Sequence, residues 1–418
     1  MKPQGRALMN GKTVLVLGGG IGGLTAANEL RQRLGREHRI ILVEQNPSHV
    51  FAPSLLWLMT SDRTPEQVAR PLSQLLRNGV ELVLGKVSRI DPEKRRVEVG
   101  GHTLDYDYLV VALGADLKPE AIPGLKEGAY TFYTLEGTIA LRDALRRFEG
   151  GKIAVVVSAM PYKCPGAPHE AAMLINDFFR QRHKAAEIHL FTPEPQPLPV
   201  AGPQLGEMVR QMLESKSITF HPKYKLTSVD SQLKVISFEG QESFSYDLLI
   251  AIPPHGASTI LKQAGLTNDA GWVPADRGTL ATRHDRIFAI GDVAAIPLPG
   301  RWKVDVQLAL PKAGVFAHDQ ALVTARRITA EINGQKLSDT FCGGGYCMLE
   351  VGGDLAGFAS GDFFAEPPSI ELHRVGKIWH LGKVLMEKWW LSRPGIKKSI
   401  FKAALRLGSK TLKIPASF

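Results

Sequence analysis

Thr13-Val-Leu-Val-Leu17, followed by Gly18-Gly-Gly-Ile-Gly-Gly23, is the stretch that decides the fold of this chain. The apolar run predicts a short buried strand, and the pattern from Leu24 to about Leu34 predicts a helix. The glycines at 18, 20 and 23 fit G-x-G-x-x-G, which provides a tight turn, backbone approach to a pyrophosphate and close helix-on-strand packing. We therefore expect an α/β unit with a dinucleotide phosphate at the helix N-terminus.

Three further segments favour a ligand at this turn over a glycine-rich turn that binds nothing. Ile40-Ile-Leu-Val-Glu44 predicts the next strand, and its terminal carboxylate is placed to hold ribose hydroxyls. Tyr108-Leu-Val-Val-Ala-Leu-Gly114 and Ile287-Phe-Ala-Ile-Gly-Asp292 predict two more buried strands. A helical pattern then restarts at Pro311-Lys-Ala-Gly314.

The middle of the chain repeats the strand but lacks the glycine loop. Lys152-Ile-Ala-Val-Val-Val-Ser158 predicts a buried strand, and Ala-Met-Pro-Tyr-Lys-Cys-Pro-Gly follows it. Prolines have no donor N–H and fix φ, so this turn is poorly built to hold a pyrophosphate. Because Cys164 stands where a second phosphate loop would be, a sulfur compound is favoured over a nicotinamide as the electron donor.

Two motifs make a family resemblance specific: Lys-Cys-Pro-Gly-Ala-Pro-His-Glu from Lys163 to Glu170, and Gly345-Tyr-Cys-Met-Leu-Glu350. With the strands above, they resemble the two-dinucleotide-domain flavoproteins, and among these the sulfide:quinone oxidoreductases. The likeness extends over nearly the whole chain. It implies an α/β fold with two Rossmann-like dinucleotide-binding domains, FAD as cofactor, sulfide as donor and a membrane quinone as acceptor.

In that family the cysteines that match Cys164 and Cys347 form a redox-active disulfide over the flavin. Cys164 follows a lysine and precedes a predicted helix from His169 to Phe179, a setting that favours the thiolate. Glu170 is either an acceptor for the proton of hydrogen sulfide or a carboxylate that stabilises this helix N-terminus. Cys342 is close to Cys347 in sequence, and its role stays open.

The expected FAD contacts come from the glycine loop, from the ends of later strands and, by resemblance, from lysines near the isoalloxazine. They are Gly18, Gly20, Ile21, Gly22, Gly23, Glu44, Val87, Ala112, Gly114, Gly291, Asp292, Lys312, Gly314 and Lys383. Residues 129–135 lack a cysteine that many family members carry, which argues against a covalent flavin link at this position; whether FAD is covalently attached at all stays open. Three cysteines without a neighbouring histidine are a poor zinc set, and no metal is expected.

Positive charge is concentrated at the C-terminus. From His373 to Phe418 there are eleven Lys/Arg and one acid, which accounts for the whole net charge of +10. If residues 396–413 form a helix, a set of apolar side chains lies on the face opposite a set of basic side chains. The apolar set is Ile396, Ile400, Phe401, Ala404, Leu405, Leu407 and Leu412; the basic set is Lys398, Lys402, Arg406, Lys410 and Lys413. Lys397 is the main exception to this division.

Three tryptophans, Trp379, Trp389 and Trp390, precede this segment. A basic amphipathic helix with interfacial tryptophans is typical of a segment that lies in an anionic membrane surface. The alternative is a helix packed on its own protein with a solvated basic face. The pattern predicts a C-terminal amphipathic membrane-docking segment and argues against nucleic acid as the partner.

The composition suits a globular chain of several cores, with 418 residues, 44% hydrophobic and 22% charged. We expect a split FAD domain (1–116 and 270–335), a degenerate nicotinamide domain (117–269) and a C-terminal region (336–418) with Cys347 and the docking segment. Met1 to Lys12 has no apolar signal region, and no stretch reaches about 18 apolar residues. This predicts a peripheral (monotopic) protein on the cytoplasmic side of a membrane; a homo-oligomer is possible.

Three other functions stay open. A type II NADH:quinone dehydrogenase shares the FAD motifs but requires an intact second glycine loop. A flavocytochrome c sulfide dehydrogenase flavoprotein shares both cysteines but requires an export signal and a haem partner. A non-catalytic flavoprotein sensor on a membrane predicts that sulfide fails to bleach the flavin.

Overall fold

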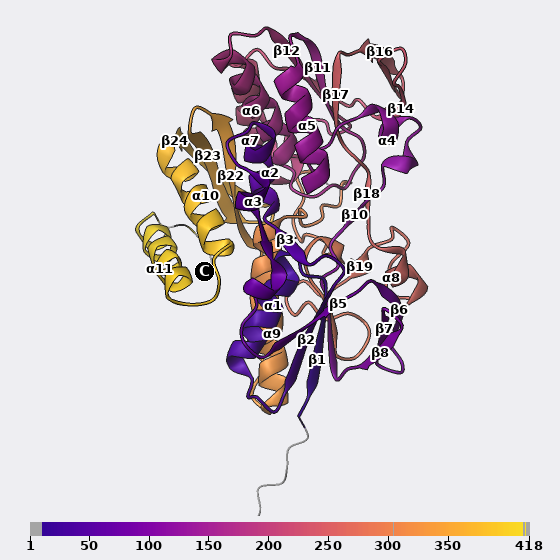
Figure 1. Cartoon of the computed structure of the whole chain (residues 1–418), viewed down its shortest axis with the longest axis vertical. Coiled ribbons are helices and arrows are strands. Elements are labelled where there is room, and N and C mark those ends of the chain that lie inside the picture. Colours follow the sequence, from indigo (N-terminus) through magenta and orange to yellow (C-terminus); the bar gives the residue numbers. More distant parts are fainter. Residues whose placement is uncertain (1–10, 304, 413, 415–418) are drawn as a thin grey trace, which may run out of the picture.

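The computed structural model describes residues 11–303, 305–412 and 414. Two parallel sheets, each accompanied by helices, occupy the lower and upper halves of the molecule in Figure 1, and a C-terminal sheet with two helices lies along one side. This arrangement confirms the α/β fold with two Rossmann-like units.

The lower sheet has the strand order β20-β9-β1-β2-β5, and its pairs are parallel. Its strands are β1 (Thr13–Leu17), β2 (Arg39–Glu44), β5 (Val80–Leu84), β9 (Tyr108–Val111) and β20 (Ile287–Ala289). The chain thus leaves this sheet after β9 and returns to its edge with β20. Helices α1 (Ile21–Arg33) and α9 (Gly314–Ile332) pack against each other beside it.

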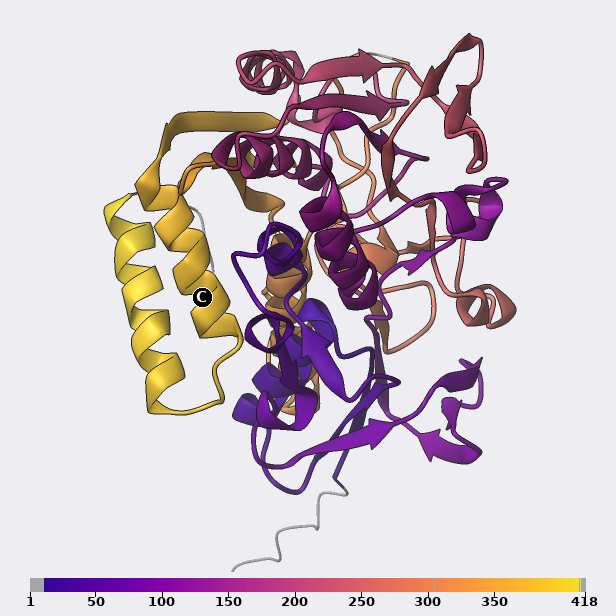
Figure 2. The same cartoon turned by 45° about the horizontal axis from the view of Figure 1, so that its top comes forward.

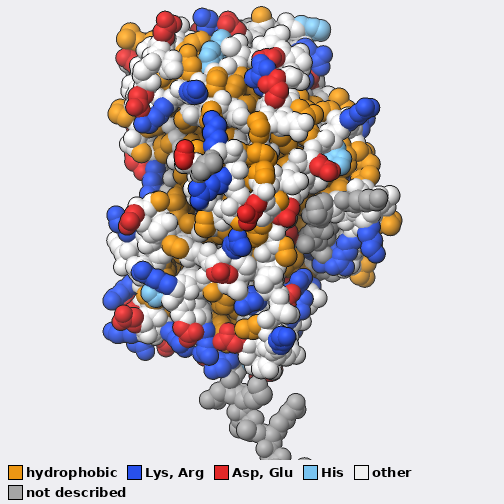
Figure 3. Space-filling view, turned by 180° about the vertical axis from the view of Figure 1, so that it is seen from behind, with side chains coloured by type: hydrophobic (Ala, Val, Ile, Leu, Met, Phe, Trp, Pro, Cys, Tyr) orange, Lys and Arg blue, Asp and Glu red, His pale blue; other side chains and the backbone are white. Residues whose placement is uncertain are grey.

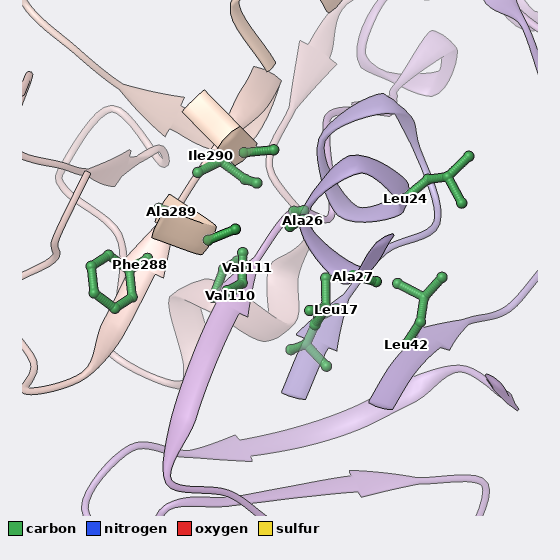
Figure 4. Packing of buried hydrophobic residues seen from close by; sticks show 14 of the residues in the cluster. Leu17, Leu24, Ala26, Ala27, Leu42, Val110, Val111, Phe288, Ala289 and Ile290 are labelled. Atoms are coloured by element: carbon green, nitrogen blue, oxygen red, sulfur yellow. The ribbon is translucent and has the colours of Figure 1, made fainter. Parts of the chain in front are cut away.

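Apolar side chains fill the space between this sheet and its helices. Figure 4 shows Leu17, Leu42 and Val111 from the strands close to Ala26 and Ala27 of α1. All five are almost fully buried. Because the strands bury side chains on both faces, they read as continuous apolar runs and not as an alternating pattern.

The upper sheet has the order β13-β12-β11-β17, again with parallel pairs. Its strands are β11 (Gly151–Val157), β12 (Ala186–Thr192), β13 (Thr219–Pro222) and β17 (Leu248–Ile252), and its helices are α5 (Leu135–Arg147), α6 (Ala167–Gln181) and α7 (Pro203–Glu214). Helix α6 begins two residues earlier than the sequence predicts, and it places the loop of Cys164 between β11 and its own first turn.

The C-terminal region is an antiparallel sheet followed by a pair of helices, which Figure 2 shows along the side of both α/β units. Its elements are β22 (Gly344–Gly352), β23 (Leu355–Asp362), β24 (Ser369–Gly376), α10 (Lys377–Trp390) and α11 (Ile396–Thr411). The turn from β22 to β23 has positive φ at Gly352, Gly353 and Asp354, a conformation that glycine adopts without strain. Strand β22 begins beside Phe316 of α9 and ends beside Asp177 of α6, and Cys347 lies between these two ends.

Short elements complete the described chain. They are β3 (Ser48–Val50), α2 (Leu55–Met59), α3 (Pro65–Val68), β4 (Ala69–Pro71), β6 (Val87–Asp91), β7 (Arg96–Val99), β8 (His102–Asp105), β10 (Asp116–Leu117), α4 (Leu125–Gly128), β14 (Leu226–Asp230), β15 (Val235–Phe238), β16 (Gln241–Ser245), β18 (His255–Gly256), α8 (Thr259–Gln263), β19 (Val273–Pro274) and β21 (Ala294–Ala295). Among the described residues, no helix combines the length and apolar character needed to cross a bilayer.

The three tryptophans are not interfacial, so that part of the sequence interpretation is wrong. Trp379, Trp389 and Trp390 are all buried. Trp379 stacks on Phe358 at a centroid distance of 4.5 Å, and Trp390 Nε1 donates a hydrogen bond to His49 Nε2 at 2.7 Å. Their large apolar surfaces attach α10 to the rest of the protein.

The predicted division of α11 into an apolar and a basic face also needs correction. Leu405 is buried in the core, and Lys398, with its Nζ donating to Trp390 O, faces the protein. Burial lowers the pKa of Lys398 to about 8, and the charges of Arg77 and Lys402 contribute to this shift. Lys413 lies outside the described residues.

Several apolar side chains of these two helices face outward instead. Ile396, Ile400 and Leu407 of α11 are 82%, 62% and 69% exposed, and Ile378 and Leu381 of α10 are 51% and 62% exposed. We call these five residues the outer apolar face. Figure 3 shows the molecule from behind, with hydrophobic and basic side chains intermixed on the protrusion at the right, where these helices lie.

Candidate active site

A cavity of about 1810 Å³ lies between the two α/β units and the C-terminal region in the described part of the chain. It is lined by the glycine loop after β1, by the Cys164 loop, by the residues before α9, by β22 and by α10. Every residue predicted as a catalytic or FAD contact lines it, except Gly23. A cavity of this size exceeds the usual volume for a small ligand and can take a dinucleotide together with a second molecule.

The glycine loop is shaped for a dinucleotide. Gly18 has φ +101°, and a Cβ on it would lie 2.3 Å from Ala112 O. A Cβ on Gly23 would lie 1.8 Å from Gly18 O, so this glycine permits the close approach of α1 to β1 instead of lining the cavity. A Cβ on Gly20 would meet nothing within 4 Å, so the backbone there is open to a ligand. These spaces fit the pyrophosphate of FAD.

Glu44 lies at the end of β2 and supports the same loop. Its Oε2 accepts a hydrogen bond from Gly19 N at 2.6 Å, and its Oε1 accepts one from Asn46 N at 2.9 Å. The carboxylate therefore lies at the cavity edge, where the sequence predicts a ribose contact. His49 Nδ1 lies 2.9 Å from Gly19 O and connects the loop, through Trp390, to α10.

The Cys164 loop is attached to the segment before α9. Cys164 N donates to Lys312 O at 2.6 Å, and Cys164 O accepts from Ala167 N at 2.9 Å. Cys164 has φ +56°, a left-handed conformation that non-glycine residues rarely adopt and that is enriched at functional sites. The Tyr133 hydroxyl donates to Lys163 O at 2.8 Å and fixes the preceding residue.

Cys347 lies against the same loop from β22. A Cβ on Gly166 would be 3.3 Å from Cys347 Sγ and 3.8 Å from Glu170 Oε2, so the thiol and the carboxylate both border this glycine. Cys164 and Cys347 are free, partly buried thiols that line the cavity. Cys342 is exposed, is not among the lining residues, and contacts Thr340 O at 3.5 Å.

The pKa of Cys164 is opposite to the sequence prediction. Burial raises the pKa of this thiol to about 12, and the Glu170 carboxylate adds to the increase while Lys383 opposes it. Burial and Glu170 likewise raise the pKa of Cys347. The cation that lowers the pKa of Cys164 is Lys383 and not the predicted Lys163, whose ammonium lies over the Tyr133 ring at 6.0 Å.

Glu170 and Lys383 form a buried ion pair with 2.6 Å between Oε1 and Nζ. Glu170 Oε1 also accepts a hydrogen bond from Glu350 N at 3.0 Å, which ties α6 to β22. Burial lowers the pKa of Lys383, but the carboxylates of Glu170 and Glu350 raise it by more. Lys383 is therefore a stable buried cation beside the two thiols.

Lys312 and Asp292 also line the cavity, and the Lys312 backbone bonds the Cys164 loop. Lys312 Nζ donates to Asp292 O and lies 3.5 Å from the centroid of the Trp272 ring. Burial lowers the pKa of Lys312 to about 8, against the opposing effect of the Asp292 carboxylate. Burial raises the pKa of Asp292, partly offset by Lys163 and Lys312.

Sequence reasoning missed a second buried carboxylate in the cavity wall, Glu194. Its Oε2 accepts hydrogen bonds from Tyr162 Oη at 2.9 Å and Thr192 Oγ1 at 3.0 Å. Burial raises the pKa of Glu194 to about 7. Glu350 and His380 were missed as well, although the i, i+3 spacing of His380 and Lys383 was an available signal for a shared helix face.

These features define an α/β oxidoreductase that holds a dinucleotide in one unit and brings two thiols and a buried ion pair to it from elsewhere in the chain. The family model of the pyridine nucleotide-disulphide oxidoreductases matches residues 12–311. The chain belongs to this family and is an FAD-dependent oxidoreductase. The match ends before β22, so Cys347 and Lys383 lie beyond it.

Similar proteins confirm the resemblance to the sulfide:quinone oxidoreductases that the sequence indicates. The chain is 25% identical over 369 residues to the mitochondrial sulfide:quinone oxidoreductase of Mus musculus, covering 85% of this chain and 79% of the relative. It is 26% identical over 406 residues to the sulfide-quinone reductase of Aquifex aeolicus, covering 91% and 90%. The crystal structure of the sulfide:quinone oxidoreductase from Aquifex aeolicus matches with a TM-score of 0.82 at 23% identity over 96% of this chain and 95% of that one, which supports the fold.

Proposed function

We propose that this chain is a sulfide:quinone oxidoreductase that oxidises sulfide to zero-valent sulfur or polysulfide and passes the electrons to a membrane quinone. One observation carries the proposal: two thiols from distant segments, Cys164 and Cys347, line one cavity with a glycine loop and a buried ion pair. The names of the mouse and Aquifex relatives support the same activity.

The cysteines perform the sulfur chemistry as a disulfide. Hydrosulfide attacks one sulfur, a new S–S bond forms to that cysteine as a persulfide, and the other cysteine leaves as a thiolate. Glu170 accepts the proton of hydrosulfide, as its place beside Cys347 allows. Lys383 favours the released thiolate, since its charge lowers the pKa of both cysteines against the effect of burial.

FAD supplies the two-electron relay between the sulfur site and quinone once it is bound. The glycine loop, Glu44 and the ends of β9 and β20 would hold its dinucleotide part, and Lys312 and Gly314 would lie by the ring system. A glycine loop follows β1 but none follows β11, and this difference disfavours a nicotinamide as the electron donor.

The outer apolar face is the proposed membrane contact. Three exposed apolar side chains of α11 and two of α10 have basic neighbours, among them Lys397, Arg406 and Lys410, which are exposed on α11. Apolar side chains that enter the interface and lysines or arginines that meet anionic headgroups both strengthen such binding. The cavity reaches Met386 on α10, which would give a lipid-soluble quinone a short path.

The domain boundaries follow the predicted division. The split FAD domain comprises 1–116 and 270–335, the degenerate nicotinamide domain comprises 117–269, and 336–418 carries Cys347 and the docking helices. The membership of β20 in the sheet of β1 and the pairing of β22 with β23 and β24 support these limits.

The deciding experiment mixes the purified flavoprotein first with sulfide and then, in a separate sample, with NADH, and follows flavin absorbance. Sulfide is expected to bleach the flavin within seconds and added quinone to restore it. NADH alone is expected to have no effect. Rapid bleaching by NADH with no response to sulfide would assign the protein to the NADH:quinone class instead.

A further inference from the structure

A row of titratable side chains, joined between Glu170 and Glu350 by a backbone N–H, leads from the cavity to the protein surface on the side of α10. It begins at the Glu170–Lys383 ion pair, where Glu170 Oε1 also accepts the hydrogen bond from Glu350 N. Glu350 Oε2 lies 2.9 Å from His380 Nδ1. His380 Nε2 lies 3.6 Å from Asp354 Oδ1, and the Asp354 side chain is 82% exposed.

Glu350 is suited to exchange protons in both directions. It is 1% exposed, and its Oε1 is a buried atom without a hydrogen-bond partner among the described residues. Burial raises the pKa of this carboxyl group, partly offset by Lys383 and His380. A half-satisfied carboxylate between a lysine and a histidine costs stability, so its place in the fold calls for a functional reason.

His380 forms the outer end of the row. Its ring makes an edge contact with Trp57 of α2 at a centroid distance of 5.6 Å. Its charged partners are Glu350 from β22 and Asp354 from the following turn. Lys383 from its own helix and Arg63 from the segment after α2 both lie over the Trp57 ring that His380 contacts. The side chain of His380 is 17% exposed, so it reaches solvent while its inner nitrogen contacts the buried carboxylate.

We propose that Glu350 and His380 form the proton path between solvent and the Glu170–Lys383 pair. The inference rests on the proposed function. Oxidation of hydrosulfide and reduction of quinone balance as HS⁻ + quinone + H⁺ → S⁰ + hydroquinone. Sulfide releases one proton, which Glu170 takes, and the hydroquinone needs two, so each turnover draws one proton from solvent into a buried site. Glu350 and His380 hand that proton inward.

The test compares Glu350→Gln and His380→Ala with the wild-type flavoprotein. Both variants are expected to keep single-turnover bleaching by sulfide, because Glu170 takes that proton internally. Steady-state quinone reduction is expected to fall at least tenfold, and added imidazole is expected to restore much of it in His380→Ala by acting as a mobile proton carrier. His373→Asn is the control, since the His373 ring contacts Phe358 and Trp379 and lies outside the proposed proton path.

A second measurement does not depend on turnover. In full-length protein labelled at histidine, the imidazole NMR signals of His380 are expected to shift on Glu170→Gln, since the row connects the two sites, whereas those of His373 are not. Unchanged His380 signals, quinone turnover equal to that of His373→Asn, or a loss that imidazole does not restore would each overturn the proton path. If the wild-type protein shows no bleaching by sulfide, the proposed function fails separately.

Discussion

The two cavity cysteines differ from the third in ways that a substitution series can measure. Cys164→Ser and Cys347→Ser are each expected to abolish flavin reduction by sulfide while FAD stays bound. Cys342→Ser is expected to retain most activity, since Cys342 is exposed and outside the cavity lining. Under the proposed function the two cavity thiols act as one unit, so the double variant should be little worse than either single one. Stopped-flow absorbance measures all four.

A pair of Cys164 with Cys342 is the competing assignment. It would require Cys342→Ser to be as inactive as Cys164→Ser, and Cys347→Ser to retain turnover. The flavin spectrum before sulfide is added serves as the control for intact folding in each variant.

Glu194 makes stability depend on pH in a direction that is unusual for a carboxyl group. Its pKa is raised to about 7 in the folded protein, so between its ordinary value of 4.5 and about 7 the unfolded chain loses this proton and the folded chain keeps it. Stability from this group is therefore lost as the pH rises through that window. Glu194→Gln, which keeps an acceptor for Tyr162, is expected to be more stable than wild type at pH 8 by up to about 3 kcal/mol.

Urea unfolding at pH 8 and pH 4.5 measures this difference, which should vanish at the lower pH. An equal change at both pH values would show that the substitution acts through packing alone.

At the scale of single residues, sequence motifs identified the glycine loop and the two thiols of the cavity lining but not its electrostatics. The glycines, Glu44 and both cavity cysteines were named from local spacing and family likeness. The predicted shift of the Cys164 pKa had the wrong direction. Burial and the Glu170 carboxylate raise this pKa, and the burial arises only when β22 and α10 pack over the loop. Glu350 and His380 were missed for the same reason: their pairing joins a strand to a helix thirty positions away.

The turn between β1 and α1 offers a matched pair of substitutions at the scale of an element. Gly23→Ala would place a Cβ 1.8 Å from Gly18 O and is expected to destabilise the protein by about 2 kcal/mol or more. Gly20→Ala meets no protein atom within 4 Å, so the fold should persist while the methyl group intrudes on the ligand. We expect FAD affinity to fall roughly tenfold or more in this variant.

Thermal unfolding of the FAD-free protein and a flavin titration separate the two effects. Equal loss of stability in both variants would contradict the assignment of Gly20 to the ligand and Gly23 to packing.

Elements with continuous apolar runs were predictable, and those defined by distant partners were not. The strands at 13, 40, 108 and 287 were recognised because parallel strands buried on both faces keep a strong local signal. The face of α11 was misassigned because Leu405 and Lys398 face inward only through their contacts with α10 and the lower unit. A basic amphipathic pattern indicates two faces, and neighbouring helices decide which one is covered.

For the whole molecule, the outer apolar face predicts binding to anionic membranes. Ile400→Glu with Leu407→Glu is expected to release the protein from vesicles that contain phosphatidylserine, since two carboxylates would replace apolar contacts and repel the surface. Sulfide-dependent bleaching should be unaffected. Leu233→Glu is the matched control, because Leu233 is 74% exposed on the hairpin between β14 and β15.

Vesicle sedimentation at low and at 0.5 M salt measures this binding. Sedimentation of the double variant equal to that of Leu233→Glu would exclude α11 as the contact. The deletion of the whole segment would be a poorer test, because Leu405 and Leu412 pack against the protein.

A bond between Cys164 and Cys347 would join the upper α/β unit to the C-terminal sheet and close a covalent loop of roughly 180 residues. Closing a loop of this length removes about 5 kcal/mol of freedom from the denatured chain. Under the proposed function, sulfide opens the loop in every cycle, and the loop would close again when the sulfur leaves and two electrons pass through FAD to quinone. The protein would then be most resistant to denaturation in the oxidised state without substrate. Sulfide, by opening the bond, would lower the stability of the enzyme that oxidises it.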